Sequence, residues 1–233
     1  MNDRLIIVLI FLLYFSPVFY QLIKVLKERK KEYKKTQRKL LSYTKYSIAT
    51  LFFSIIFLAI LSHINFLNYE KPMTFDKYNQ ITFQNFRGLE FFKKTLYGNE
   101  KFAYIVTSIN SKIHDDSVTI NSLFHPSRSF VYNKHTNSTD LLTHEKYHFK
   151  ITELFVRKAK NKISKLNQIS KNEIKKIIKN IKEEERLFQK EYDSATFHSY
   201  VYNQQKKYEK EIDSLLNLLN EFKKTKIKFN EKN

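Results

Sequence analysis

Two long apolar stretches near the start of the chain restrict the fold of that region more than any other feature of the sequence. They run from Leu5 to Ile23 and from about Tyr46 to Phe66, each close to the ~20 residues that a helix needs to cross a bilayer. Main-chain polar groups inside a bilayer must bond to one another, so single segments of this kind cross as helices. No small-residue cleavage site follows the first stretch, which argues against a signal peptide. We therefore expect transmembrane helices over residues 1–23 and 46–66, the first kinked at Pro17.

The segment between the two stretches is strongly basic. Residues 24–45 contain ten Lys or Arg residues against Glu28 and Glu32, and the whole chain has a formal net charge of +19. Short basic loops stay on the cytoplasmic side of a membrane, so this pattern predicts that both termini lie outside the cytoplasm. The basic segment is interpreted as this topology signal rather than as a nucleic-acid site, and no nucleic-acid partner is expected.

The rest of the chain is predicted to form one exported α+β domain. A linker over residues 67–74 leads into residues 75–233, which are long enough for a domain with its own core. Only two Gly and three Pro occur in the chain, so long helices are expected after the first part of the domain. Turn-like residues at Gly88, 97–99 and 114–116 separate the expected strands. These strands are Ile81–Phe83, Phe102–Thr107 and Ser117–Leu123.

Two helical patterns occupy the C-terminal part. Apolar residues recur at helical spacing from Ile174 to Phe188 and again from Tyr208 to Phe222, with Asn203 as the expected cap of the second helix. The second pattern fits either a coiled-coil seam or a face packed on the domain, and packing is preferred because the seam is short. The Lys-rich faces between residues 157 and 182 are interpreted as solvated, with contact to anionic lipid as the alternative.

The five residues from His144 to His148 read H-E-K-Y-H and are the best candidate for a chemical site. On a helix the two histidines project from one face, where neutral imidazoles can hold Zn²⁺. Glu145 would then act as general base toward metal-bound water, whose pKa falls from about 15.7 to about 7 in such sites. The chain has no cysteine, which excludes thiolate ligands and a cysteine nucleophile. By chance alone this motif would occur roughly once in 70 chains of this composition.

The flanking residues support a helix at the motif. Residues 137–140 are of the helix-capping kind, and neither Gly nor Pro interrupts the chain from Leu141 through the motif. Leu141, Ile151 and Phe155 fall on the side of the histidines, so that side is expected to face a partly apolar interior. The alternative is a surface helix whose histidines make ordinary hydrogen bonds.

A catalytic zinc site needs a third protein ligand. The histidines at 114, 125 and 135 precede the motif, and any loop could bring one of them near. Asp193, Glu191 and His198 cluster farther along, where a helix is expected to end. Spacing leaves all three open, and a carboxylate that is not a ligand can orient a ligand histidine instead. Exposed helix surface is the alternative for the two acids, and a helix terminus for His198.

Three blocks of the exported region resemble a family of predicted bacterial zinc-dependent proteases, long known only as a domain of unknown function. Residues 82–88 read T-F-Q-N-F-R-G and resemble the family's T-W-x-x-F-x-G. Residues 141–149 read L-L-T-H-E-K-Y-H-F and resemble L-L-x-H-E-x-x-H-F, and the match continues along the same helix to residue 158. Residues 192–198 read Y-D-S-A-T-F-H and resemble Y-D-x-x-T-x-H. The resemblance covers roughly residues 75–220.

The resemblance implies a zincin-like metallopeptidase domain, with a small N-terminal sheet, a long H-E-x-x-H helix and further helices. It implies His144, His148 and His198 as zinc ligands and Glu145 as the base. Two departures stand out: Phe83 replaces the usual Trp and keeps an aromatic role, while Ser199 replaces the usual Gly after the last histidine. A left-handed backbone at Ser199 would cost about 1 kcal/mol more than at Gly.

The sequence thus predicts a zinc peptidase anchored in a bacterial inner membrane by two helices, with its catalytic domain periplasmic or extracellular. Its expected partners are a peptide or protein substrate and the lipid bilayer. Tyr192 or Tyr147 is a candidate for stabilising the oxyanion, with packing as the alternative role for both. Rival interpretations are a non-catalytic binding module on a zincin-like scaffold and a structural two-span membrane protein that binds no metal.

Overall fold

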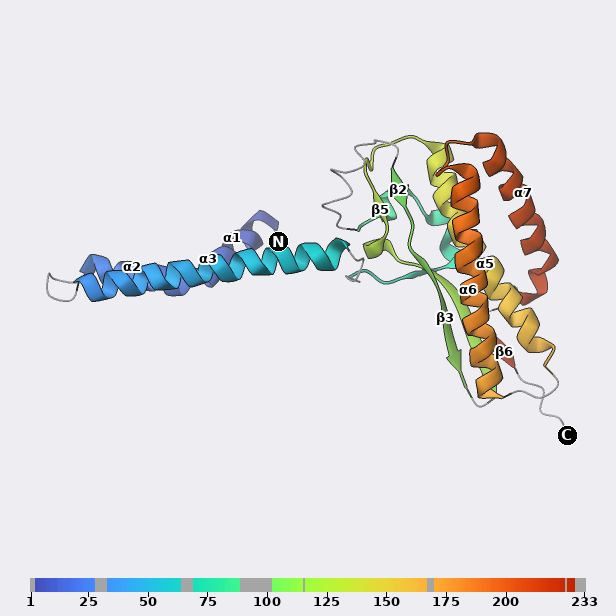
Figure 1. Ribbon diagram of the computed structural model, residues 1–233, viewed down its shortest axis with the longest axis horizontal. Coiled ribbons are helices and arrows are strands. Elements are labelled where there is room, and N and C mark those ends of the chain that lie inside the picture. The colour runs from blue at the N-terminus through green and yellow to red at the C-terminus, as the bar shows by residue number, and fades with distance from the viewer. Residues whose placement is uncertain are drawn as a thin grey trace. The chain divides into compact units, whose positions relative to one another are not determined.

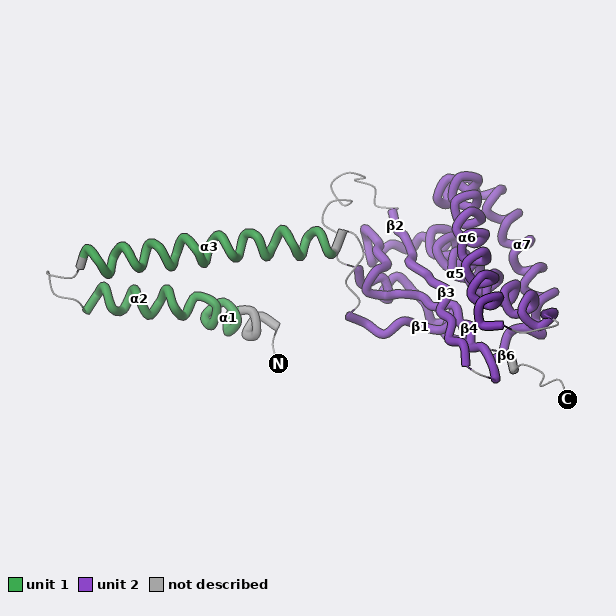
Figure 2. Tube along the Cα trace, turned by 60° about the horizontal axis from the view of Figure 1, so that its bottom comes forward, with its two compact units in different colours: residues 1–61 green, residues 62–233 purple. Residues whose placement is uncertain are grey.

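A computed structural model describes residues 3–27, 33–63, 69–88, 102–114, 116–166, 170–224 and 226–228. It divides the chain into two compact units, Met1–Leu61 and Ser62–Asn233 (Figure 2). The expected turn at residues 97–99 and Asp115 of the turn at 114–116 lie outside the described residues. The division falls close to the expected end of the membrane-anchoring region.

One helix of the first unit is long and apolar enough to cross a membrane. Helix α3 spans Tyr33–His63, and its segment Lys34–Leu61 has a mean hydropathy of 1.8 over its most apolar window. Residues 46–63 of the expected span therefore lie within a longer helix, and residues 64–66 lie outside the described residues. In the basic segment 24–45, the described residues 24–27 and 33–45 are helical, because their Lys, Arg, Gln and Leu residues favour helix and neither Gly nor Pro interrupts them.

The first expected span is broken. Helix α1 covers Asp3–Tyr14 and helix α2 covers Ser16–Lys27, with a bend of 61° between Val8–Tyr14 and α2. Pro17 lies in the first turn of α2, where its ring and missing N–H are tolerated but would not continue the preceding helix. The pair is long enough to cross a membrane only when both pieces are taken together.

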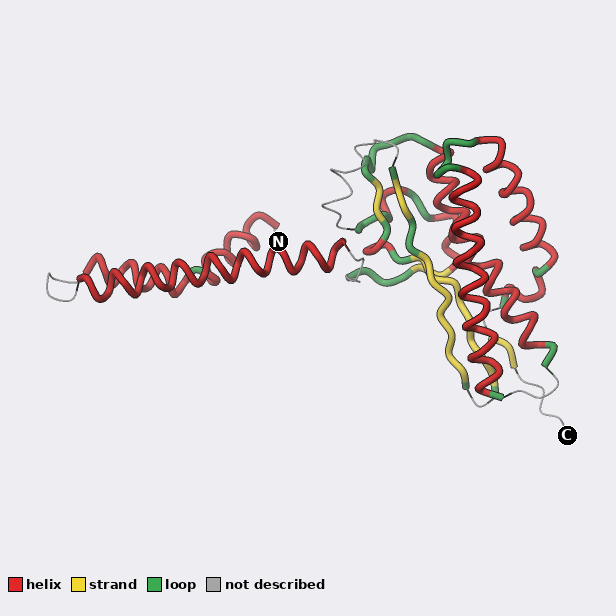
Figure 3. Tube along the Cα trace, viewed as in Figure 1, coloured by secondary structure: helices red, strands yellow, loops and turns green. Residues whose placement is uncertain are grey.

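The second unit is an α+β domain with one central strand. Strand β4, Ser117–Phe124, pairs antiparallel with β3, Thr107–Ile113, and on its other side with the short strands β1 and β6 (Figures 1 and 3). A separate pair joins β2 and β5. The bounds of the short elements are β1 Met73–Thr74, β2 Ala103–Tyr104, β5 Phe130–Val131 and β6 Lys226–Lys228, with 3₁₀ turns at Phe75–Gln80, Phe83–Asn85, Pro126–Arg128 and Asn220–Lys223.

The expected strands are confirmed in part. Ser117–Leu123 matches β4, while Phe102–Thr107 is divided between β2 and the first residue of β3. Ile81–Phe83 is not a strand: a 3₁₀ turn begins at Phe83, held by a reciprocal pair of hydrogen bonds between Thr82 and Asn85. Most of β3 was not expected, because its Ser, Asn and Lys residues dilute the apolar alternation.

Gly88 is required where it stands. Its N–H donates to the carbonyl oxygen of Ser129 at 2.7 Å, and an added Cβ would also lie 2.7 Å from that oxygen. The neighbouring atom belongs to the main chain and cannot move aside alone. Phe83 and Phe86 of the same block are buried in a small aromatic cluster with Phe124 and Phe149. The block 82–88 therefore packs the region of β4 and β5 against the motif helix.

Three long helices complete the domain. Helix α5, Thr139–Ser164, packs on β3 and β4 and contacts both α6, Lys171–Thr196, and α7, Tyr202–Leu218. Ser138 caps α5 by accepting from the N–H of Leu141, as expected. Asn203 does not cap α7, which begins one residue earlier after Val201. Ile212 and Leu216 are buried in the domain core, which confirms packing as the role of the α7 apolar face.

Candidate metal centre

The motif helix carries its two histidines into the interior. His144 and His148 lie one turn apart near the start of α5, with side chains 0% and 12% exposed. Their rings are nearly perpendicular, and their Nε2 atoms are 3.2 Å apart. Both Nε2 atoms therefore face the same point.

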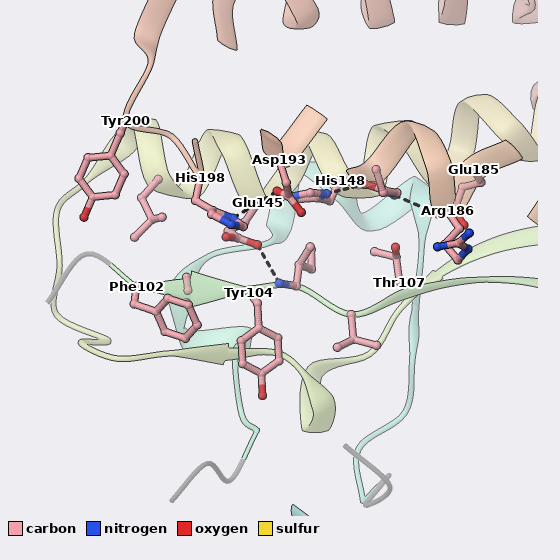
Figure 4. Close-up of a pocket in the computed structure, with 15 residues that line it drawn as sticks. Phe102, Tyr104, Thr107, Glu145, His148, Glu185, Arg186, Asp193, His198 and Tyr200 are labelled. Carbon is pink, nitrogen blue, oxygen red and sulfur yellow. Dashed lines mark hydrogen bonds and ion pairs between the residues drawn. The ribbon is translucent and has the colours of Figure 1, made fainter. Parts of the chain in front are cut away.

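Helix α6 brings a carboxylate to that point. The Oδ1 atom of Asp193 lies 3.2 Å from His144 Nε2 and 2.9 Å from His148 Nε2. Figure 4 shows Asp193 beside His148. Tyr192 holds α6 against α5, because its ring is fully buried and stacks on His144 with the ring centroids 4.7 Å apart. Among the described residues, His144, His148 and Asp193 form the group whose ligand atoms could hold a metal ion.

Side chains behind the two imidazoles orient them. The Nδ1 of His148 donates to Gln189 Oε1, while Gln189 Nε2 donates to the carbonyl oxygen of His148 and to Glu185 Oε1. Those acceptors define the orientation of the amide, so Nδ1 of His148 carries a proton and Nε2 faces Asp193. The Oγ1 of Thr196 lies 3.5 Å from His144 Nδ1 and donates to Tyr192 O.

The charges at the site are strongly coupled. Burial lowers the pKa of His144 to about 4, so this ring is neutral near pH 7. Burial also lowers the pKa of His148, but the hydrogen bond and charge of Asp193 outweigh it and raise that pKa to about 9. Burial opposes ionisation of Asp193. Its hydrogen bonds with His144, His148 and His198 nevertheless hold the pKa of its carboxyl group well below the usual range.

This arrangement fits a metal ion. Without one, His144 Nε2 and the Asp193 carboxylate are two acceptors that share the proton on His148 Nε2. The three atoms are 2.9 to 3.2 Å apart. Ligands at bonds of about 2.0–2.1 Å in a tetrahedral site lie roughly 3.3 Å from one another. A cation would replace the proton with little movement of the side chains.

Glu145 lies beside this group and is almost fully buried, with 2% exposure. Its Oε2 accepts from the main-chain N–H of Ile105 at 2.7 Å, as the close-up shows (Figure 4). Burial raises the pKa of its carboxyl group to about 7. A carboxylate with a pKa near neutrality can both take up and release a proton at physiological pH.

A cavity of about 680 Å³ opens next to these residues. One wall is the segment 102–107, which runs from β2 into β3, and the opposite wall comes from α5 and α6 (Figure 4). Glu145, His148 and Asp193 line it, so the candidate metal group is accessible from the cavity. Tyr104 and Tyr200 also contribute to the lining.

His198, the ligand preferred from the sequence, lies next to Asp193 but outside the metal group. Its Nδ1 is 3.4 Å from Asp193 Oδ1, and its side chain is 65% exposed and lines the cavity. Contact with the Asp193 carboxylate raises the pKa of His198. Glu191 points elsewhere, since it accepts from Tyr208 at 2.8 Å.

Neither tyrosine proposed for the oxyanion is among the described residues that line the cavity. Tyr147 projects from another side of α5 and donates to Asp213 at 2.8 Å. Tyr192 packs its ring on His144, and its buried hydroxyl has no hydrogen-bond partner among the described residues. Packing, the alternative role for both, accounts for their positions.

The sequence interpretation missed the groups that orient the site. Gln189 and Asp193 are four residues apart on α6, matching the spacing of the histidines on α5, and this repeat was a usable signal. Thr196 belonged to the third block of the resemblance, although no role was assigned to it. The N–H of Ile105 had no sequence signal, because any residue supplies a main-chain donor.

The turn after Asp193 is strained. Phe197, His198 and Ser199 have φ angles of 46°, 50° and 77°, in the left-handed region that non-glycine residues seldom adopt. Phe197 ends α6 in this conformation, and Val201 N–H bonds back to Thr196 O at 2.9 Å. Strained backbone of this kind is common at functional sites, and here it carries His198 to the cavity.

Replacing Ser199 with glycine should stabilise the protein by about 0.5–1 kcal/mol, because glycine adopts φ near 77° without the Cβ penalty. Thermal unfolding of the purified full chain measures the effect. Ser194→Gly, inside α6, is the matched control and should destabilise by a similar amount. Equal destabilisation by both variants would contradict the left-handed turn.

Comparisons with protein-family models, with curated proteins and with solved structures found no match to this chain. The resemblance to the predicted zinc-dependent proteases therefore stays a prediction based on the three sequence blocks. The geometry of the site is the independent observation from which a function can be argued.

Proposed function

We propose that this protein is a membrane-anchored zinc-dependent hydrolase that acts on peptide bonds. One observation carries the proposal: the Nε2 atoms of His144 and His148 converge with the Asp193 carboxylate on one point. The buried carboxyl group of Glu145 lies beside that point, and both border the same cavity. A binding module would not need a carboxyl group with a pKa of about 7 beside the metal group.

The donor set favours zinc over magnesium and calcium. Two imidazole nitrogens and one carboxylate oxygen are typical of catalytic zinc sites, which keep a fourth position open. Magnesium and calcium prefer oxygen ligands alone. We assign His144, His148 and Asp193 as the ligands, with His198 as the alternative third ligand that the sequence favours.

The chain's own residues supply the proton transfers. His144, His148 and Asp193 would hold the zinc ion, which would supply a Lewis acid to polarise the substrate carbonyl and to lower the pKa of water to about 7. Glu145 takes the proton from the attacking water and delivers it to the leaving amine. The N–H of Ile105 holds Oε2 in place, so the other carboxylate oxygen is the one that accepts the proton. His198 lines the cavity beside Asp193, so we assign it to face the negative charge that develops on the substrate.

The three resembling blocks support the proposal because they come together around one region. Residues 141–149 and 192–198 provide the three ligands, Glu145 and Thr196, while Phe86 of residues 82–88 shares a buried cluster with Phe149 of the motif helix. The implied zincin-like fold and peptidase activity belong to this proposal.

Removing one ligand tests the metal group. Wild type should bind one zinc ion per chain, and His144→Ala and Asp193→Ala should each weaken binding by at least about 100-fold, since even outer-shell partners are worth 10–100-fold. Metal analysis and competition with a chelating dye measure this. His135→Ala changes an exposed histidine and should bind normally. Equal zinc in wild type and His144→Ala would end the model; loss with His198→Ala but not with Asp193→Ala would make His198 the third ligand.

Glu145→Gln separates an enzyme from a binding module. The amide can still accept from Ile105 N–H, so zinc content should be unchanged, while hydrolysis should fall about 10²–10⁴-fold because the base is lost. A library of quenched fluorescent peptides provides the assay. Glu191→Gln is the control, since Glu191 contacts only Tyr208 among the described partners. Unaltered hydrolysis by Glu145→Gln would exclude its role as base.

The proposed anchor has two crossings, α3 and the bent pair α1–α2, with residues 69–233 outside the cytoplasm. The excess of Lys and Arg between the apolar stretches supports this orientation. Protease added to intact spheroplasts should therefore digest the C-terminal domain and leave a cytoplasmic marker protein whole. Protection of the domain until the membrane is dissolved would reverse the topology.

A further inference from the structure

A second hollow is lined by β3 and α6, which also line the cavity at the candidate metal centre. It has a volume of about 620 Å³ and lies between β3 and the N-terminal half of α6. We call it the lysine groove. Its lining residues are Ser111 and Ile113 of β3 and Lys175, Ile178, Lys179 and Lys182 of α6.

The groove combines positive charge with an apolar floor. Lys175, Lys179 and Lys182 recur at steps of four and three, so they share one face of α6. All three are exposed, and none forms an ion pair within the described part of the chain. Ile113 of β3 and Ile178 of α6 supply the apolar lining of the groove. No acidic side chain is among the described residues lining this groove, so an anionic ligand would meet no repulsion from its walls.

The strand beside the groove has an unpaired edge. The carbonyl oxygen of Val106 accepts from His125 N–H, and His114 N–H donates to the carbonyl oxygen of Ser117. Even-numbered residues of this strand therefore direct their main-chain groups toward β4, and the odd-numbered residues from 107 to 113 direct theirs away. No described strand pairs with β3 on that side. Such an edge can accept an extended polypeptide.

The lysine groove continues the cavity at the metal centre. Thr107 lines that cavity and begins β3, while Glu185, Arg186 and Gln189 of α6 line it from the other side. At about 1.5 Å per residue, α6 rises roughly 16 Å from Lys182 to Asp193 and roughly 27 Å from Lys175. An extended chain at about 3.3 Å per residue covers those lengths with about five to eight residues.

We propose that the lysine groove binds an acidic stretch of the polypeptide substrate, held extended along β3 about five to eight residues from the bond that is cut. The proposal rests on the proposed function for its reference to a cut bond. Antiparallel pairing, the commoner kind, makes the substrate run from Ile113 toward Thr107 and so toward the metal centre. The acidic residues then lie on the N-terminal side of that bond.

Peptide binding to the full chain in detergent tests the proposal without any turnover. The protein carries Glu145→Gln, and the probe is a labelled peptide of about 14 residues, enough to span both hollows at about 3.3 Å per residue. One version has four Glu in its N-terminal half, a second has Gln at those places, and a third has the four Glu in its C-terminal half. Fluorescence anisotropy gives each Kd.

The first version should bind tightest. Changing Lys175, Lys179 and Lys182 together to Gln should weaken its binding roughly tenfold, as expected for three partly exposed charge pairs. The matched control changes Lys176, Lys190 and Lys207 to Gln. It removes the same amount of charge outside the groove and should alter the Kd less than about twofold. The Gln peptide should bind equally to both triple variants.

Equal weakening by the two triple variants would overturn the proposal, since only net charge would then matter. Tighter binding of the third peptide would overturn the antiparallel direction. Vesicles containing anionic lipid that displace the first peptide only when the three groove lysines are present would identify a lipid contact instead. Repeating the measurement with His144→Ala separates the two proposals: groove-dependent binding that persists in a chain without metal supports the lysine groove even if hydrolysis fails.

Discussion

The contact of one carboxylate with two imidazoles organises the domain. Asp193 of α6 meets His144 and His148 of α5 inside the structure, where a charged or polar group without a partner would cost several kcal/mol. This requirement sets the register of the two helices, because a slip of one turn would leave both histidines without their partner. Gln189 and Thr196 flank Asp193 at four and three residues and complete the same match.

Helix α5 contributes to both the core and the candidate site, because one of its faces is apolar and another carries the two histidines. Ile151 and Leu154 bury its apolar side against the sheet and the other helices. Farther along, the buried Glu153–Arg157 pair is satisfied by Ser122 of β4 and by the carbonyl oxygen of Leu216 on α7. Breaking such a buried pair is costly, so it helps to hold α5 between β4 and α7. The site is thus built on an element braced from several sides, as precise ligand geometry requires.

The seam between β3 and α6 places two different environments along one path. Near Asp193 the lining is polar and titratable, whereas near Lys175 it is basic over an apolar floor. The strand has an outward edge along this path, which is the reason that the ligand we propose for both hollows is an extended polypeptide. Chemistry at one end and charge recognition at the other would then act on the same extended chain.

The sequence by itself determined the candidate residues of the site and the periodic elements. The H-E-K-Y-H spacing, the Ser138 cap and the apolar repeats predicted α5, α6 and α7, and alternation predicted β4, because these signals are local. Only the tertiary structure decided that Asp193, rather than Glu191, faces the two histidines of α5, and that the main-chain N–H of Ile105 donates to Glu145. Those outcomes depend on helix packing and on contacts over 40 residues or more, such as Ile105 with Glu145, and the periodicity of a chain carries no information about them.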